Sequence, residues 1–280
     1  MRSSIINING QLLPEEKTGL SIQNRAFKFG DSIFESIRIV KGRALFLEDH
    51  FSRISKGMKE LKFIPPFQWD LSGFRKEILK TLEANNIKAG GRIRYTAFRK
   101  GEGLYVPKSR EMAFTVEAYP KELDAFELNT TGQKITVYNE FPMQYNRLSQ
   151  FKTNNCLPYI MAGMYAQEEG FDEVILLNDS GNMCEATSSN VFLYINGILY
   201  TPALTEGCVA GVMRKKILQL AKKMNIAVVE SSLGPNLLEE ADEVFFTNAI
   251  NGIKWAVAWE KKRYFHKLSA RFIAALNEIS

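Results

Sequence analysis

Apolar and polar positions in the first 120 residues follow the spacing of strands in some segments and of helices in others. Residues 3–8 are strand-like and end at Asn9-Gly10, a dipeptide typical of a hairpin turn. After a turn at Gly30-Asp31, apolar residues at 33, 37 and 39 alternate with polar ones at 36 and 38, which predicts a half-buried strand. Two further strands are expected at 91–99 and 112–118.

Two helices are predicted between these strands. The first begins at Glu48-Asp49, because acidic residues are favoured in the first turn of a helix. Its apolar face consists of Phe51, Ile54, Met58 and Leu61, and His50 and Arg53 lie on a different arc. The second helix is expected from about Asp70 to Asn86. Strands that alternate with two helices make this part of the chain α+β.

The second half of the chain follows a polar segment, 121–131, that is typical of an interdomain linker. The run 174–177 is almost entirely apolar and predicts a buried strand, and turns at 179–181 and Asn196-Gly197 predict an antiparallel meander. The other expected elements are a strand at 134–138, a helix at 155–169, a helix from 211, strands near 226–230, 242–247 and 253–258, and a helix near 267–277. We therefore expect an N-terminal domain, 1–120, and a C-terminal domain, 132–280.

The composition is that of an ordinary globular protein and excludes several classes. The 280 residues are 45% apolar, enough for a core in two domains. The net charge of +5 comes from 36 basic residues scattered among 31 acidic ones, without the basic, aromatic-rich stripe of a nucleic-acid-binding protein. No apolar run is long enough for a signal peptide or a membrane span. We expect a soluble, cytoplasmic protein with no nucleic-acid or membrane partner.

The cysteines and histidines indicate no metal site. Cys156, Cys184 and Cys208 are odd in number and widely spaced, as expected for reduced thiols in a cytosol. His50 and His266 add no ligand at a spacing that would complete a metal cluster.

Four features could carry chemistry, and each has a simpler explanation. A lysine such as Lys152 acts as a nucleophile only when its amine is partly neutral, and otherwise it is a surface residue. Glu185 is a lone carboxylate in an uncharged strand, so it is either functional or at an edge facing water. The glycine-rich start of the helix at 211 could bind an anion or be a structural cap. Arg53 is either a phosphate ligand or a solvated helix residue.

Taken together, eight blocks occur in the order and approximate spacing of one family. They are Arg25 to Arg38, His50-x-x-Arg53, Lys152-x-x-Asn155, Gly170 to Glu173, Glu185 to Phe192, Tyr200-Thr201-Pro202, Gly211 to Arg214 and Ala241 to Thr247. Over nearly its whole length the chain resembles the class IV aminotransferases. These are the fold-type IV pyridoxal phosphate enzymes, which include branched-chain aminotransferases, D-amino acid aminotransferases and 4-amino-4-deoxychorismate lyases.

The resemblance implies a fold and an assembly. The fold is a two-domain α+β protein, with a smaller α/β N-terminal domain and a C-terminal domain that has a twisted antiparallel sheet or pseudo-barrel with helices. The pyridoxal 5'-phosphate would lie in the cleft between the domains. Members of the family are homodimers in which the partner subunit helps to close the pocket, so a homodimer is expected.

The resemblance also implies roles for individual residues. Lys152 resembles the lysine that holds the cofactor covalently and moves the proton between substrate and cofactor. Glu185 resembles the carboxylate that faces the pyridine nitrogen and keeps it protonated. Arg53 is similar to the arginine that pairs with the phosphate. The amides of Val212 and Met213, with Thr247, would complete the phosphate site.

The substrate carboxylate should be bound by a cation. Arg99 resembles the arginine that has this role in D-amino acid enzymes, Arg94 is a second candidate, and Tyr105 could donate from the same loop. Subfamily signals conflict. Leu157 stands where branched-chain enzymes usually carry tyrosine. The Lys-x-x-Asn spacing after Lys152, the Gly-Val-Met-Arg helix start and Thr247-Asn248-Ala249 look more like the lyase, whereas Phe34-Glu35 resembles the transaminases.

The expected activity is transamination between an amino acid, branched-chain-like or D-configured, and a 2-oxo acid. The first alternative is the lyase, which releases pyruvate and 4-aminobenzoate from aminodeoxychorismate. A second alternative, a protein that binds the cofactor without catalysis, is disfavoured because Lys152, Glu185 and Arg53 are retained together.

Overall fold

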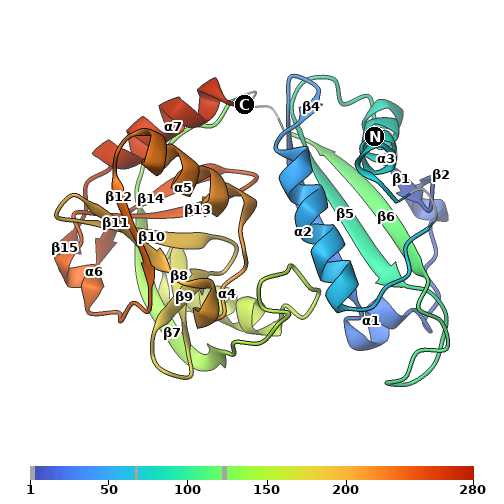
Figure 1. The fold of residues 1–280 in the computed structure, drawn as a ribbon, viewed down its shortest axis with the longest axis horizontal. Coiled ribbons are helices and arrows are strands. Elements are labelled where there is room, and N and C mark those ends of the chain that lie inside the picture. Colours follow the sequence, from blue (N-terminus) through green and yellow to red (C-terminus); the bar gives the residue numbers. More distant parts are fainter. Residues whose placement is uncertain (1–3, 67–68, 122–124) are drawn as a thin grey trace. The chain divides into compact units, whose positions relative to one another are not determined.

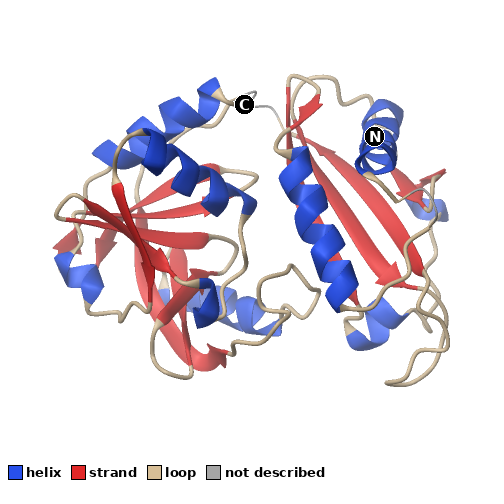
Figure 2. Cartoon of the chain, in the orientation of Figure 1, coloured by secondary structure: helices blue, strands red, loops and turns tan. Residues whose placement is uncertain are grey.

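The computed structural model describes residues 4–66, 69–121 and 125–280. The chain divides into two compact units, Met1–Asp124 with Phe151–Asn155 and Ala125–Gln150 with Cys156–Ser280. Each unit combines helices and strands (Figures 1 and 2). The expected linker 121–131 includes residues 122–124, which lie outside the described part of the chain, and residues 125–131 belong to the second unit. Residues 151–155, expected in the C-terminal domain, belong by their contacts to the first unit.

In the described residues, the first unit is built on a six-stranded sheet of strand order β2-β1-β6-β5-β3-β4, with every neighbouring pair antiparallel. The strands are β1 (Ile5–Ile8), β2 (Gln11–Pro14), β3 (Ser32–Val40), β4 (Arg43–Ala44), β5 (Gly91–Arg99) and β6 (Met112–Pro120). The helices are α1 (Arg25–Phe29), α2 (Leu47–Glu60) and α3 (Leu71–Ala84). The apolar sides of α2 and α3 form one core with β3, β5 and β6. The strands and the two long helices predicted for this part of the chain are therefore present.

The segment 25–40 differs from its prediction in two ways. Arg25–Phe29 forms the short helix α1, capped by the Asn24 side chain and ended by Gly30 in the left-handed conformation. Strand β3 is buried on both faces: Ile37 packs in the helix-facing core, and Arg38, on the opposite face, is only 2% exposed. The prediction of a half-buried strand was therefore wrong, because polar side chains are buried on the second face.

Residues 151–155 attach to the edge of β3. The amide of Phe34 donates to the Lys152 carbonyl at 2.8 Å, and Thr153 forms an antiparallel bridge with Ile33. In the described residues, strand β4 pairs with Ile39 and Val40 at the end of β3, so the start of β3 can pair with residues 151–155. The backbone of Lys152 is thereby fixed on the sheet.

In the described residues, the second unit is built on a nine-stranded mixed sheet with the order β12-β11-β10-β13-β14-β7-β8-β9, and β15 pairs with β14. The strands are β7 (Gln133–Met143), β8 (Glu173–Asn178), β9 (Met183–Ala186), β10 (Asn190–Ile195), β11 (Ile198–Pro202), β12 (Ala227–Ser231), β13 (Glu243–Asn248), β14 (Gly252–Trp259) and β15 (Lys262–Arg263). The helices are α4 (Leu157–Glu169), α5 (Val212–Lys223), α6 (Leu237–Glu240) and α7 (Lys267–Glu278).

The two-domain α+β fold class is confirmed, but the strand connections of the second unit differ from the prediction. The pairs β7/β8, β7/β14 and β11/β12 are parallel, so the sheet is not antiparallel throughout. The two predicted turns do join hairpins, β8/β9 and β10/β11, but β9 and β10 are not hydrogen-bonded neighbours. Strand β9 contacts β10 nonetheless, so the sheet curls as a half-barrel rather than running as a meander.

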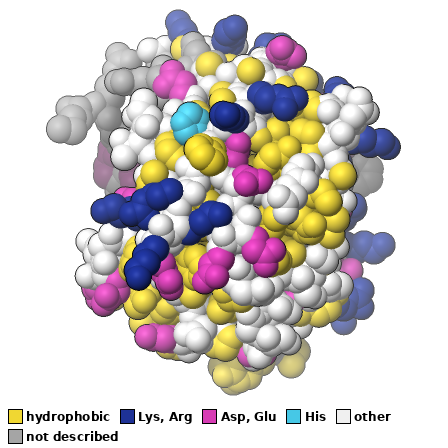
Figure 3. Space-filling model, turned by 90° about the vertical axis from the view of Figure 1, so that its left-hand side faces the viewer, with side chains coloured by type: hydrophobic (Ala, Val, Ile, Leu, Met, Phe, Trp, Pro, Cys, Tyr) yellow, Lys and Arg dark blue, Asp and Glu magenta, His cyan; other side chains and the backbone are white. Residues whose placement is uncertain are grey.

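In the described part of the chain, no helix has both the length and the hydropathy of a membrane span. On the face drawn in Figure 3, basic and acidic side chains are interspersed rather than gathered into a field of one sign.

Candidate functional site

The first group of predicted residues, in the first unit, surrounds the ring of Phe34. The Lys152 Nζ atom lies 5.0 Å from the ring centroid, and the guanidinium carbon of Arg94 lies 3.8 Å from it. Arg94 Nη2 also donates to the Asn154 side chain at 3.1 Å, two residues from Lys152. The Lys152 amine and the Arg94 guanidinium therefore lie beside the same aromatic ring.

Arg53 lies on the helix-facing side of the same sheet, in an ion-paired cluster. Its Nε and Nη2 atoms donate to the two oxygens of Glu35 at 2.7 and 2.5 Å, and His50 Nδ1 contacts the same carboxylate at 2.6 Å. Burial by itself raises the pKa of Glu35, but the charges of Arg53 and His50 outweigh it and hold that pKa at about 2. Arg53 is mostly buried, so the interpretation as a solvated helix residue was wrong.

Arg99 is enclosed in a structural network. Its Nε and Nη2 atoms donate to Asp31 at 2.9 and 3.2 Å, and its guanidinium also donates to the carbonyls of Leu61 and Lys62. Burial raises the pKa of Asp31, but hydrogen bonds from Arg99 and Arg25 bring it below its ordinary value. These contacts fasten the end of β5 to the end of α2.

Tyr105 lies in an exposed loop. Its side chain is 90% exposed, and its ring contacts Phe29 with centroids 5.9 Å apart. Arg25 donates to the carbonyls of Gly103 and Leu104 and so ties this loop to α1.

The second group, in the second unit, surrounds Glu185. This residue is on β9, at the end of the strand order, yet it is only 4% exposed. Its Oε1 atom accepts from the Tyr159 hydroxyl at 2.7 Å, and its Oε2 atom accepts from the Val209 amide at 3.1 Å and Asn190 Nδ2 at 3.3 Å. The water-facing interpretation of Glu185 is therefore wrong.

The start of α5 lies beside this carboxylate. Asn190 Nδ2 also donates to the Val209 carbonyl, and a Cβ at Gly211 would lie 2.0 Å from Asn190 Oδ1, so only glycine fits there. Val212 and Met213 follow as the first residues of the helix, where amide groups have no intrahelical acceptor. Within the described chain, no side chain caps this helix start.

Thr247 joins the same group from the neighbouring strand. It pairs with Asn190 across β10 and β13 and is almost fully buried. Its Oγ1 atom has no hydrogen-bond partner among the residues that the structure describes. A buried hydroxyl without a partner is costly, which indicates that a polar ligand group completes it.

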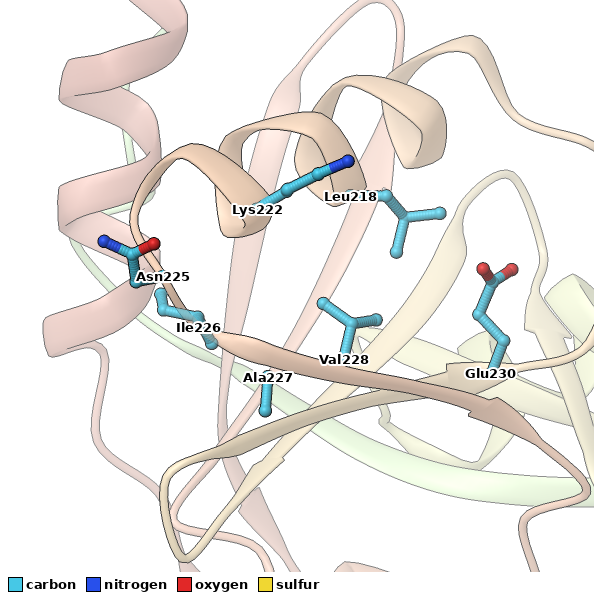
Figure 4. A pocket seen from close by; sticks show the side chains of 7 residues that line it. All are labelled: Leu218, Lys222, Asn225, Ile226, Ala227, Val228 and Glu230. Carbon is cyan, nitrogen blue, oxygen red and sulfur yellow. The ribbon is translucent and has the colours of Figure 1, made fainter.

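A shallow hollow at the other end of α5 is separate from this group. Figure 4 shows that side chains from the last turns of α5 and from β12 line it, with Lys222 and Glu230 carrying opposite charges. In the described residues, no cluster of three or more histidine, cysteine or acidic side chains could hold a metal ion.

Comparisons with known proteins identify the family. The family model Amino-transferase class IV matches residues 32–257. A protein provisionally named branched-chain-amino-acid aminotransferase from Methanocaldococcus jannaschii is 30% identical over 244 residues, 86% of this chain and 83% of the relative. D-alanine aminotransferase from Bacillus licheniformis is 28% identical, over 86% of this chain and 83% of that protein. Aminodeoxychorismate lyase from Bacillus subtilis is 27% identical, over 88% and 83%.

The fold agrees with these matches. The structure of a branched-chain aminotransferase from Thermoproteus uzoniensis superposes with a TM-score of 0.88 at 24% identity, covering 99% of this chain and 94% of that one. The chain belongs to the class IV aminotransferase family and is a pyridoxal-phosphate-dependent enzyme, as its sequence indicated.

The residues of the second unit fit this cofactor. A phosphate would supply acceptors for the Thr247 hydroxyl and for the amides at the start of α5, since helix N-termini favour anions. Glu185 is a buried carboxylate beside that helix start and fits a protonated ring nitrogen. Lys152, whose amine could hold the aldehyde group of pyridoxal 5'-phosphate covalently, belongs to the first unit.

Sequence reasoning missed two residues that contact Glu185. Tyr159 is one aromatic residue within the predicted helix 155–169, and no local pattern links it to Glu185, 26 residues later. Asn190 was part of a matched block, but its contact with Glu185 depends on the turn between β9 and β10. Only the folded chain brings these donors to the carboxylate.

The Glu35 cluster makes the stability depend on pH. The folded-state pKa of Glu35 is lowered from 4.5 to about 2, so its ion pair stabilises the fold above pH 4.5 and loses this contribution as the pH falls toward 2. Between pH 7 and pH 3 the wild type should lose about 2 kcal/mol of unfolding free energy that Glu35→Gln does not lose. Urea unfolding at both pH values measures the difference.

Glu48→Gln is the matched control, because Glu48 is an exposed partner of Arg75. It should follow the wild type at both pH values. Equal pH dependence in wild type and Glu35→Gln would show that the cluster does not contribute in this way.

Proposed function

We propose that the protein is an aminotransferase that moves an amino group between an amino acid, branched-chain-like or D-configured, and a 2-oxo acid. The observation that carries the proposal is the buried Glu185 carboxylate, which accepts hydrogen bonds from the Tyr159 hydroxyl and the Val209 amide beside the start of α5. When bound, the cofactor supplies a pyridine ring that withdraws electrons from the substrate Cα. Glu185 keeps a proton on the ring nitrogen, and this proton sustains the electron withdrawal.

Lys152 moves the reacting proton in this proposal. Its amine would take the proton from the substrate Cα and then return it to the carbon of the cofactor. The hydrogen bond from the Phe34 amide to the Lys152 carbonyl fixes the backbone from which the Lys152 side chain starts. The Phe34 ring lies beside the Lys152 amine. Positioning of this kind is a large part of catalysis.

In this proposal the phosphate of the cofactor is held by hydrogen-bond donors and by one positive charge. The amides of Val212 and Met213 and the Thr247 hydroxyl supply donors. Arg53 supplies a full positive charge, and the two bonds from Glu35 fix the orientation of its guanidinium.

Arg94 is the better candidate for the substrate carboxylate. The Arg94 guanidinium lies beside the same Phe34 ring as the Lys152 amine. Arg99 instead donates through Nε, Nη1 and Nη2 to Asp31 and to backbone carbonyls. Tyr105 stays a candidate on an exposed loop.

The lyase is the alternative candidate. Leu157, at the position of the branched-chain tyrosine, is 72% exposed, and a lyase is among the relatives at nearly the same identity as the aminotransferases. The same residues would then act on aminodeoxychorismate and release pyruvate and 4-aminobenzoate.

We also propose a homodimer in the cytoplasm. Leu104, Tyr105 and Val106 are highly exposed apolar side chains in one loop, which is typical of a surface that another chain covers. The three cysteines are free, and two of them are buried, which suits a reducing compartment.

The first test is the visible absorbance of the protein with pyridoxal 5'-phosphate. Wild type should gain the absorbance of lysine-bound cofactor, and Lys152→Ala should not, whereas Lys134→Ala, at an exposed strand position, should behave as wild type. Amino acids added without an acceptor should then convert the cofactor to its amine form. No conversion with any L- or D-amino acid, together with 4-aminobenzoate release from aminodeoxychorismate, would establish the lyase instead.

The second test separates the two arginines. Arg94→Gln should raise KM for the amino acid about ten- to a hundredfold, since a hydrogen bond between charged groups contributes about 1.5–3 kcal/mol. Arg99→Gln should instead lower the unfolding free energy, by about 3 kcal/mol, because it breaks a buried ion pair. The opposite pattern would transfer the substrate role to Arg99.

The third test is the mass of the particle in solution. Light scattering should give twice the chain mass of 31.8 kDa, and Val106→Glu should shift the protein toward the monomer. Lys108→Glu in the same loop is the charge control. A wild-type monomer at micromolar concentration would contradict the proposed dimer.

A further inference from the structure

The hydroxyl of Tyr159 holds one oxygen of Glu185, and nothing in the family pattern assigns this tyrosine a role. Tyr159 is in the first turn of α4, and its hydroxyl donates to Glu185 Oε1 at 2.7 Å. It lies seven residues after Lys152, two beyond Leu157. Because its hydroxyl donates to Glu185, Tyr159 does not correspond to the branched-chain tyrosine, which lies at the position of Leu157 and faces the phenolic oxygen of the cofactor.

The two oxygens of Glu185 are held by different elements. Oε2 accepts from the Val209 amide and the Asn190 side chain, which also bonds the Val209 carbonyl. The Val209 amide belongs to the segment before α5, and Asn190 is the first residue of β10. The two are closely packed, because a Cβ at Gly211 would lie 2.0 Å from Asn190 Oδ1. Oε1 is held by the Tyr159 hydroxyl, a side chain of α4.

The Tyr159 hydroxyl is a neutral donor to Glu185. Burial raises its pKa far above the ordinary range, and the neighbouring charge of Glu185 raises it further. The phenol proton therefore stays on Tyr159 and points to the carboxylate. A hydrogen bond to a charged acceptor is stronger than one between neutral groups.

A donor to a carboxylate reduces the affinity of its oxygens for a further proton. Where a carboxylate faces a ring nitrogen, the proton between them then stays closer to the nitrogen. We propose that Tyr159 is a positioning residue that orients Glu185 and weakens its pull on this proton, so that the pyridine nitrogen of the cofactor stays protonated. The inference rests on the proposed function, because it needs the cofactor ring to face Glu185.

The test measures the nitrogen itself. Protein loaded with ¹⁵N-labelled pyridoxal 5'-phosphate should give the ring-nitrogen resonance of a protonated pyridine in the wild type. In Tyr159→Phe the resonance should move toward the unprotonated value, and turnover should fall about tenfold with little change in KM, as expected when one hydrogen bond to a charged group is lost. Replacing Tyr159 by 3-fluorotyrosine, a stronger donor of similar shape, should move the resonance the opposite way.

Tyr165→Phe is the matched control, because Tyr165 is on the same helix and packs against Tyr138. It should leave the resonance and the turnover unchanged. Thermal unfolding of each variant separates loss of fold from loss of the hydrogen bond, and the fluorotyrosine protein keeps the test decisive if Tyr159→Phe is unstable.

The outcomes distinguish this inference from the function beneath it. If the wild type does not bind the cofactor, the proposed function is wrong. If the wild type binds it and shows a protonated nitrogen, but neither Tyr159 variant moves the resonance, the role of Tyr159 is refuted and the function stands.

Discussion

The buried Glu185 carboxylate constrains the three segments that surround it. A charged oxygen in the interior is tolerated only when donors surround it. Here those donors are an amide, an amide side chain and a phenol, which come from the segment before α5, from β10 and from α4. The hydrogen bonds to this one carboxylate thus fix the position of the α5 start. Thr247, whose hydroxyl has no hydrogen-bond partner among the described residues, pairs with Asn190 on the neighbouring strand.

The other buried carboxylate of interest, Glu35, is compensated in a different way. It contacts two basic side chains, Arg53 and His50, which lower its pKa to about 2. That arrangement keeps an arginine in place on α2. Glu185 instead accepts hydrogen bonds from a phenol, a backbone amide and a side-chain amide. The same residue type is thus held by two basic side chains in one unit and by a phenol and two amides in the other.

Strand parity separates the two arginines of β5. Successive side chains of a strand point to opposite faces. Arg99 continues the row of Ile93, Tyr95 and Ala97, which faces the helices, and it therefore meets the carbonyls at the end of α2. Arg94 points to the other face, where Phe34 and the Lys152 segment lie. Because Arg94 and Arg99 are an odd number of positions apart on β5, their side chains lie on opposite faces and have different partners.

The sequence by itself determined most elements, the family and the cofactor, because local periodicity and ordered motifs are properties of neighbouring residues. The predicted strands at 91–99 and 112–118 and the helix at 48–61 have close counterparts in β5, β6 and α2. The sequence did not reveal that β3 is buried on both faces or that β9 and β10 are not paired. Both features depend on which segments cover each strand and which pair with it. Only the tertiary structure showed that Tyr159 contacts Glu185 and that Arg99 is enclosed by Asp31 and carbonyls. Hydrogen bonds between residues 26 or 68 positions apart are formed by packing, and packing leaves no periodic trace in the sequence.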